Sequence, residues 1–112
     1  DGGGLNRSTG KNALEPDLAV WAGRLVAAWS ESDGAVRRVR ASIKEADGSW
    51  RALEPAGGLN AGPGRDGLGV TLAVQGGVLY AAWQERGDGP WRVRAAAAED
   101  PAQPVWRSVD GG

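Results

Sequence analysis

The hydrophobic and polar positions of this chain follow one pattern twice. Residues 18–31 return as residues 72–85, and nine of the fourteen positions are identical. The same offset of 54 residues relates Gly4-Leu5-Asn6 to Gly58-Leu59-Asn60. A repeat of this length indicates one supersecondary unit that is used twice. We therefore divide the chain into units 1–57 and 58–112, each of which includes the loop before its strands.

Each unit is predicted to form four short antiparallel strands joined by tight turns. The strands of the first unit cover residues 17–21, 24–31, 36–44 and 49–54, and the third and fourth strands of the second unit cover residues 91–98 and 105–110. Gly76-Gly77, aligned with Ala22-Gly23, is a strong signal for a two-residue hairpin turn. Four alanines at 95–98 leave a short helix as an alternative, but their alignment with Arg40-Ala41 favours a strand.

The apolar residues 25–29 do not alternate with polar ones, which is typical of a strand that is covered on both faces. Four-stranded meanders that recur at about 40–50 residues and are buried on both faces are the blades of a β-propeller. An immunoglobulin-like sandwich needs unlike strands and predicts no internal repeat. The sequence therefore predicts an all-β fold made of two four-stranded antiparallel propeller blades.

The repeated motifs also resemble those of a known group of proteins. Leu-Ala-Val, a turn, Leu-x-Ala-Ala-Trp-x-Glu, then Val-Arg, Asp-Gly-Ser-Trp and Gly-Leu-Asn are similar to blades of Trp-rich bacterial β-propeller repeat proteins, which are loosely sialidase-like arrays. The resemblance covers essentially the whole chain and implies a blade, not an activity; it also implies a secreted or extracellular location. Asp47 and Gly48 are adjacent, unlike in an Asp-box, and Arg51 follows Trp50 where a WD repeat has Asp.

Two blades do not complete a propeller, which closes with typically about four to eight. Asp1-Gly2-Gly3 equals Asp110-Gly111-Gly112, so the chain begins and ends at the same phase of the repeat. Head-to-tail contacts that close by rotation form rings. We therefore expect copies of this chain to be its partners in a homo-oligomer, with six blades as a trimer preferred to eight blades as a tetramer.

The composition of the chain excludes several classes of partner and of catalytic or metal site. Thirteen Lys and Arg residues against fourteen Asp and Glu residues give a net charge of -1, so we expect neither a nucleic-acid nor a membrane partner. The chain has no His and no Cys, which excludes a Ser-His-Asp triad, a Cys-His pair and a Cys/His zinc site. No Asp-x-Asp-x-Asp-Gly spacing indicates a calcium loop. We expect no catalytic residue, metal site or cofactor.

The six tryptophans fall into two groups. Four recur in both units and are predicted to form the blade core: Trp29, Trp83, Trp50 and Trp106. Trp21 and Trp91 break the repeat, because Gln75 and Arg37 stand at the aligned positions. An aromatic ring that breaks the pattern is the better candidate for stacking on a ligand, provided that it is exposed.

Charged residues give two further predictions. Lys11, Arg65 and Asp66 lie in the loops between blades, where propellers commonly bind ligands. Glu31 with Arg40, and Glu85 with Arg94, recur in both units and are predicted to be structural ion pairs.

The resulting hypothesis is a non-enzymatic propeller module that assembles into a ring and serves as a scaffold or binds a ligand, such as a carbohydrate in a lectin-like way or a protein. One alternative is a piece of a larger glycoside-processing enzyme, which needs carboxylates paired across a pocket, for example Glu31 or Glu85 with Asp66. Another alternative is an excised or engineered fragment that only self-assembles.

Overall fold

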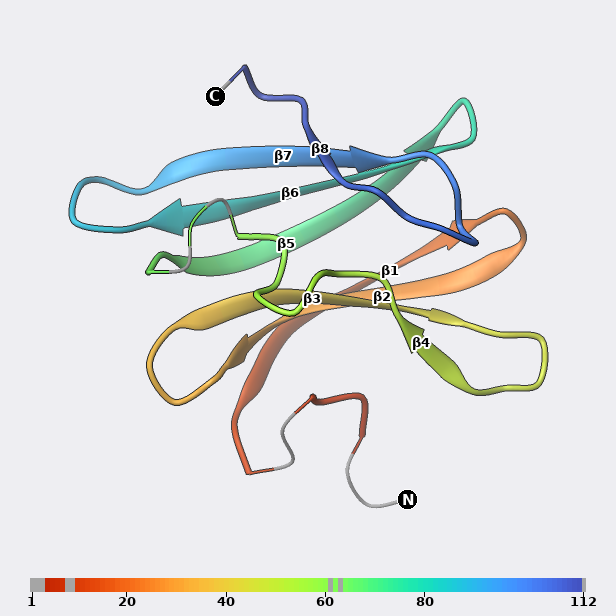
Figure 1. Ribbon diagram of the computed structural model, residues 1–112, viewed down its shortest axis with the longest axis horizontal. Helices are drawn as coiled ribbons and strands as arrows, with labels where there is room; N and C mark the ends of the chain where they lie inside the picture. Colours follow the sequence, from red (N-terminus) through yellow and green to blue (C-terminus); the bar gives the residue numbers. More distant parts are fainter. Residues whose placement is uncertain (1–3, 8–9, 61, 63, 112) are drawn as a thin grey trace.

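The computed structural model describes residues 4–7, 10–60, 62 and 64–111, and these form two four-stranded antiparallel sheets without a helix (Figure 1). The spatial order of each sheet follows the chain: β1 (Ala13–Trp21), β2 (Arg24–Ser32), β3 (Arg37–Lys44) and β4 (Trp50–Ala52), then β5 (Asp66–Gln75), β6 (Val78–Arg86), β7 (Arg92–Ala98) and β8 (Arg107–Ser108). The all-β class and the four-stranded antiparallel units are therefore confirmed. Residues 1–3 and 112, on which the match between the two chain ends depends, lie outside the described residues.

The first strand of the first sheet is longer than predicted, and the fourth strands are shorter. β1 begins at Ala13 because a β-bulge around Glu15 lets the strand continue, and β5 has the same bulge around Gly69. Both bulge residues have positive φ, 57° and 66°, as a bulge often requires. The alanines at 95–98 belong to β7, so the strand is correct and the helical alternative is wrong.

The turn between the first two strands has the same geometry in both sheets. Ala22 and Gly23 have φ of 53° and 76°, and Gly76 and Gly77 have φ of 59° and 79°. Two successive residues with positive φ form a type I′ turn, whose twist matches that of the flanking strands. The hairpin predicted from Gly76-Gly77 is thus present, and Ala22 adopts the same conformation without the freedom of glycine.

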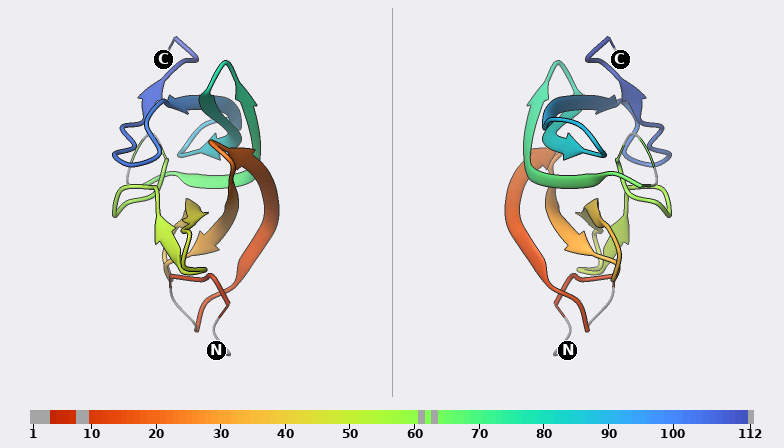
Figure 2. Two further views of the ribbon diagram at one scale, coloured as in Figure 1. Left: turned by 90° about the vertical axis from the view of Figure 1, so that its right-hand side faces the viewer. Right: turned by 90° about the vertical axis from the view of Figure 1, so that its left-hand side faces the viewer.

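The core lies between the two sheets. Residues 26–31 of β2 are all buried, at 0–4% exposure, as expected for a strand covered on both faces. Val26 and Ala28 share one core with Leu79, Ala81 and Trp83 of β6. The second sheet lies above the first in Figure 1, and the turned views in Figure 2 show the same stacking.

Hydrogen bonds also join β1 and β2 of the first sheet to β5 and the turn that follows it. Two side chains of the first sheet donate to backbone oxygens of the second, and two carboxylates of the first sheet accept from its backbone. The pairs are Ser30 Oγ with Gly67 O (2.6 Å), Trp21 Nε1 with Gly77 O (2.9 Å), Gly69 N with Glu15 Oε1 (2.8 Å) and Leu72 N with Asp17 Oδ2 (2.8 Å). These bonds fix the register of one sheet on the other.

Gly67 sits at a close approach between the sheets, which generates a stability prediction. A Cβ at this position would lie 2.6 Å from Cγ2 of Val39, a side chain with 0% exposure. Gly67→Ala is therefore expected to lower the free energy of unfolding by about 1–3 kcal/mol through overpacking, measured by urea denaturation. Gly64→Ala is the matched control, because a Cβ at Gly64 meets nothing within 4 Å. Equal stability of the two variants would contradict this account.

Candidate functional site

Trp21 is not the exposed aromatic ring that the sequence predicted. Its exposure is 1%, it belongs to the core between the sheets, and its Nε1 donates to the carbonyl oxygen of Gly77 at 2.9 Å. The prediction of a ligand-stacking ring at this position is corrected to a junction between sheets.

Trp91 is placed differently, in the segment that connects β6 to β7. Its side chain is 39% exposed, and the guanidinium of Arg86 lies 4.8 Å from the centre of the ring. A ring with one face held by a cation and an exposed surface meets the geometric requirement for stacking. Trp91 therefore stays a candidate for ligand contact.

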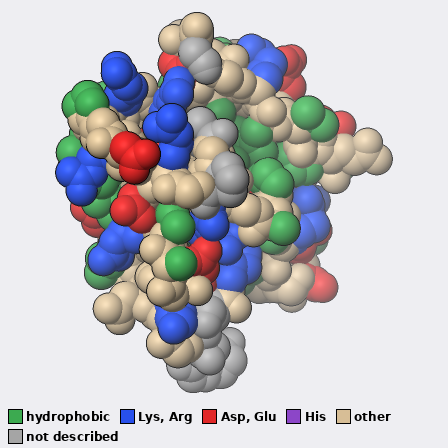
Figure 3. Space-filling model, turned by 60° about the vertical axis from the view of Figure 1, so that its left-hand side comes forward, with side chains coloured by type: hydrophobic (Ala, Val, Ile, Leu, Met, Phe, Trp, Pro, Cys, Tyr) green, Lys and Arg blue, Asp and Glu red, His purple; other side chains and the backbone are tan. Residues whose placement is uncertain are grey.

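The predicted loop residues lie near the turns that follow β2 and β6. The exposed Lys11 lies against the turn at Gly34, whereas Arg65 lies against Gly87, with its Nε 3.9 Å from Oε2 of Glu85. Both turns are on the left in Figure 1, the side brought forward in Figure 3, where basic, acidic and apolar side chains are interspersed.

Asp66 has a structural partner between the two sheets. Its Oδ1 accepts a hydrogen bond from the backbone N–H of Arg37 at 2.9 Å, which links the start of β5 to the start of β3. The side chain is half-buried. Asp66 thus helps to hold the second sheet against the first.

The four recurring tryptophans occupy interior or partly interior positions. Trp29 and Trp83 are each 4% exposed. Trp50 and Trp106 are half-buried, and Trp106 packs on the core while its Nε1 donates to the carbonyl oxygen of Leu53 at 3.1 Å.

The carboxylates of Glu31 and Glu85 are buried beside these tryptophans. Trp29 Nε1 donates to Oε1 of Glu31 at 2.8 Å, and Trp83 Nε1 donates to Oε1 of Glu85 at 2.7 Å. The two glutamates are 2% and 1% exposed. An indole N–H bound to a carboxylate satisfies two buried polar groups at once, so this Trp-x-Glu element is a repeated structural feature.

The arginines of the predicted ion pairs have carboxylate partners that the sequence reasoning missed. Arg40 Nη1 lies 3.4 Å from Oε2 of Glu54, and Arg94 Nη1 lies 3.6 Å from Oδ1 of Asp110. Direct pairs of Arg40 with Glu31 and of Arg94 with Glu85 stay predictions. Glu54 and Asp110 follow the fourth strand in both units, and this shared position was the signal that could have found them.

Glu54 and Asp110 also bind the edge of the third strand in their sheets. Oε1 of Glu54 accepts from the backbone N–H of Ala41 at 2.9 Å, and Oδ2 of Asp110 accepts from that of Ala95 at 3.0 Å. These carboxylates thus bind the edge of the third strand just beyond the ends of β4 and β8.

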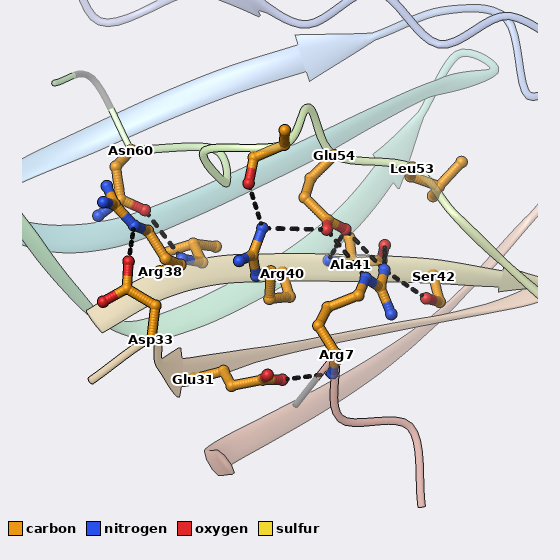
Figure 4. A network of polar contacts seen from close by, with 12 residues as sticks. Arg7, Glu31, Asp33, Arg38, Arg40, Ala41, Ser42, Leu53, Glu54 and Asn60 are labelled. Atoms are coloured by element: carbon orange, nitrogen blue, oxygen red, sulfur yellow. Dashed lines mark hydrogen bonds and ion pairs between the residues drawn. The ribbon is translucent and has the colours of Figure 1, made fainter. Parts of the chain in front are cut away.

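Arg7 fills a cradle on the first sheet (Figure 4). Its guanidinium lies 5.2 Å from the centre of the Trp29 ring, and its Nη2 donates to Ala41 O (3.0 Å), Ser42 Oγ (2.8 Å) and Glu54 Oε1 (2.8 Å). The side chain of Glu54 is only 3% exposed. Arg7 therefore combines a cation–π contact with a charge-assisted bond to a buried carboxylate.

Asn60 extends the same edge of β3. Its Oδ1 accepts from the backbone N–H of Val39 at 2.8 Å, and its Nδ2 donates to the carbonyl oxygens of Arg37 at 2.8 Å and Arg65 at 2.6 Å. Asn6 forms the bond that corresponds to the last of these, from Nδ2 to Lys11 O at 2.9 Å. The repeated Gly-Leu-Asn motif thus shapes the loop that leads into each sheet.

Two aspartates at turns have lowered pKa values. Backbone N–H groups of Val36 and Ala35, followed by the guanidinium of Arg38, hold the pKa of Asp33 well below its ordinary value. The hydroxyl and backbone N–H of Ser49 lower the pKa of Asp47. Hydrogen bonds to the charged form of a carboxylate are the common cause.

Comparison with known proteins gives no family assignment: no protein-family model matches the chain, and no curated protein matches its sequence. The described residues contain no group of three or more His, Cys, Asp or Glu side chains that could hold a metal ion. Within the same residues, no helix has the length and apolar character needed to cross a membrane.

The contacts of Glu54 with Arg7 and Arg40 predict that a small substitution has a large effect on stability. Glu54→Gln keeps the size of the side chain but removes the charge that Arg7 and Arg40 share, so we expect a loss of about 2 kcal/mol in the free energy of unfolding. The measurement is urea denaturation. Glu99→Gln is the control, because Glu99 and Arg107 form a pair with side chains 65% and 54% exposed; it should cost less than about 0.5 kcal/mol.

Asp33 predicts a pH dependence of stability. A carboxyl whose pKa is lowered by folding contributes stability above its unfolded pKa and loses that contribution as the pH falls through the folded pKa. The protein should therefore lose stability below about pH 4, and Asp33→Asn should show a weaker pH dependence in acid. Thermal melts across this range test the claim, and the two proteins should converge once Asp33 is protonated. Parallel melting curves at every pH would contradict it.

Proposed function

We propose that the chain is a non-enzymatic β-propeller module that assembles head to tail into a closed ring and serves as a scaffold or binds a ligand. The observation that carries the proposal is the contrast between equivalent residues in the two sheets. Val39 is 0% exposed where the second sheet covers it, and Val93, at the same repeat position, is 72% exposed. Leu79 is 0% exposed and its equivalent Leu25 is 39% exposed.

The contact inside the chain is a template for contacts between chains. The face of the first sheet that carries Val26 and Val39 packs against the face of the second sheet that carries Leu79 and Trp83. In the first sheet, the face that is not packed against the second sheet is therefore the one equivalent to the Trp83 face. In the second sheet, the face that is not packed against the first sheet is the one equivalent to the Val39 face. Faces of this kind complement each other, as a heterologous interface requires.

The free face of the first sheet is also apolar and hollowed. Leu18 and Val20 are 60% and 61% exposed, and a cavity of about 560 Å³ is lined by Leu14, Leu18, Ala27 and Trp29. Contiguous exposed apolar surface marks interaction sites in soluble proteins. A second copy of the chain supplies the surface that this face would meet in a longer array.

The rival proposals receive less support. In a glycoside-processing enzyme, Glu31 or Glu85 would act with Asp66, but both glutamates are buried and bound by indole N–H groups. Asp66 is bound by a backbone N–H. An excised or engineered fragment remains compatible with the same surfaces, since self-assembly would be its property too. A ligand, carbohydrate or protein, would be expected at Trp91 on the exposed turn side.

The mass in solution tests the assembly. We expect light scattering to give three times the chain mass of 11.6 kDa for a ring of six blades, or four times for eight blades. A folded protein that stays at 11.6 kDa up to its highest soluble concentration would overturn the proposal.

One pair of variants locates the interface. Val93→Asp places a charge on the free face of the second sheet and should reduce the mass to that of one chain, because an unpaired charge in an interface is costly. Val105→Asp is the matched control: Val105 is 77% exposed but precedes β8 at the outer edge, so the mass should not change. Loss of assembly in both variants would contradict the assigned faces.

A further inference from the structure

The second sheet contains a cavity at the place where Arg7 lies on the first sheet. This cavity, of about 240 Å³, is lined by Leu59, Trp83, Ala95, Ala96, Trp106 and Asp110, together with Ser108 and the arginines Arg94 and Arg107. Leu59, Trp83, Ala95, Ala96 and Asp110 are the repeat equivalents of Leu5, Trp29, Ala41, Ser42 and Glu54. Those five residues of the first unit are the ones whose rings, oxygens or carboxylates meet the Arg7 guanidinium.

The two units differ at the position of the arginine that fills the first site. Asn6 is followed by Arg7, whereas the equivalent Asn60 is followed by Ala61. The second unit therefore has no arginine at the point in its sequence where the first unit has the one that fills the cradle. Three of the five residues that meet the Arg7 guanidinium are nevertheless identical in the second unit, whereas Ala96 replaces Ser42 and Asp110 replaces Glu54.

The geometry of the cradle is repeated as well. Ala95 N donates to Asp110 at 3.0 Å, as Ala41 N donates to Glu54 at 2.9 Å. The backbone N–H of Val109 donates to Ala95 O at 3.0 Å, as that of Leu53 donates to Ala41 O at 2.9 Å.

The contacts of the aromatic ring and of the neighbouring arginine are also repeated. Trp83 is held by Glu85 as Trp29 is held by Glu31, at 2.7 and 2.8 Å. Arg94 reaches Asp110 at 3.6 Å, as Arg40 reaches Glu54 at 3.4 Å. The ring face, the carbonyl oxygen and the carboxylate that bind Arg7 thus recur, and only the Ser42 hydroxyl is lost, because Ala96 replaces it.

We propose that this cavity, formed by Trp83, the Ala95 carbonyl and Asp110, is a binding site for a guanidinium group supplied from outside the chain. A guanidinium is planar, stays charged, stacks on an indole ring and donates to a carboxylate and a carbonyl in one orientation. Lysine offers a compact ammonium that does not stack in this way. The site is built within one chain, so it goes beyond ring assembly and does not depend on it.

The experiment follows the indole N–H signals of the intact protein by NMR during titration with methylguanidinium chloride. Signals of Trp83 and Trp106 should shift and saturate, and that of Trp29, covered by Arg7, should not. Methylammonium chloride at equal ionic strength should leave all of them in place. Uniform, non-saturating shifts, or equal shifts with both salts, would overturn the proposal.

Three variants sharpen the assignment. Asp110→Asn keeps an acceptor for Ala95 N but removes the charge, and it should weaken binding about tenfold. Asp88→Asn, at an exposed turn residue, makes the same change in charge and should leave binding unchanged. Arg7→Ala should open the equivalent cradle, so that methylguanidinium now also shifts the Trp29 signal. If Asp110→Asn binds as tightly as the native protein, the site is wrongly assigned.

Two peptides distinguish the source of the group. Acetyl-Gly-Arg-Gly-amide should bind the native protein, and acetyl-Gly-Lys-Gly-amide should not. Tighter binding of the arginine peptide than of methylguanidinium would identify an arginine side chain of a polypeptide as the ligand, and equal or weaker binding would identify a small guanidino compound. Either result supports the guanidinium site, whereas equal binding of the two peptides would overturn it.

Discussion

The burial of consecutive residues of β2 is the constraint on which the rest of the structure depends. A strand with apolar residues on consecutive positions has no face that it can turn to water, so it needs a neighbouring sheet on each side. Residues 26–31 of β2 are buried, although within the chain a second sheet covers only the face that carries Val26 and Ala28. Its far face is covered in part by Arg7, whose guanidinium lies over Trp29. The tight approach at Gly67 and the bonds along β1 and β5 follow from the need to bring two such sheets together.

A small set of repeated side chains provides hydrogen-bond partners for several of the polar groups inside the sheets. Buried donors and acceptors are costly without partners, and each unit uses a Trp-x-Glu pair and a carboxylate after its fourth strand to provide them. Glu54 serves a backbone N–H and two arginines at once. The carboxylate after the fourth strand therefore acts as part of the sheet, not as a free acid, and the same is true of Asp110 with Ala95 N.

Much of this fold could be predicted from the repeat. The Gly76-Gly77 pair predicted the hairpin turn, and the apolar run at 25–29 predicted the buried strand, because these two features depend on local conformation and composition. The burial of Trp21 between the sheets could not be predicted from the repeat. Its burial depends on which sheet follows it in space, and Gln75 shows only that the position differs. The carboxylate partners of Arg40 and Arg94 depend on where the fourth strands stop pairing. A hydrophobic pattern does not predict that position.

Several residues that break the repeat lie at the junction between the sheets, and this placement has a consequence for the proposed ring. Glu15 and Asp17 bind backbone N–H groups of the second sheet, but their equivalents are Gly69 and Thr71. Gly67, which allows the close approach of Val39, is matched by Ala13. A junction between two chains would therefore lack two carboxylate contacts and would have an extra methyl group at its tightest point. Such a ring would be held less firmly between chains than within them, and it would open there first.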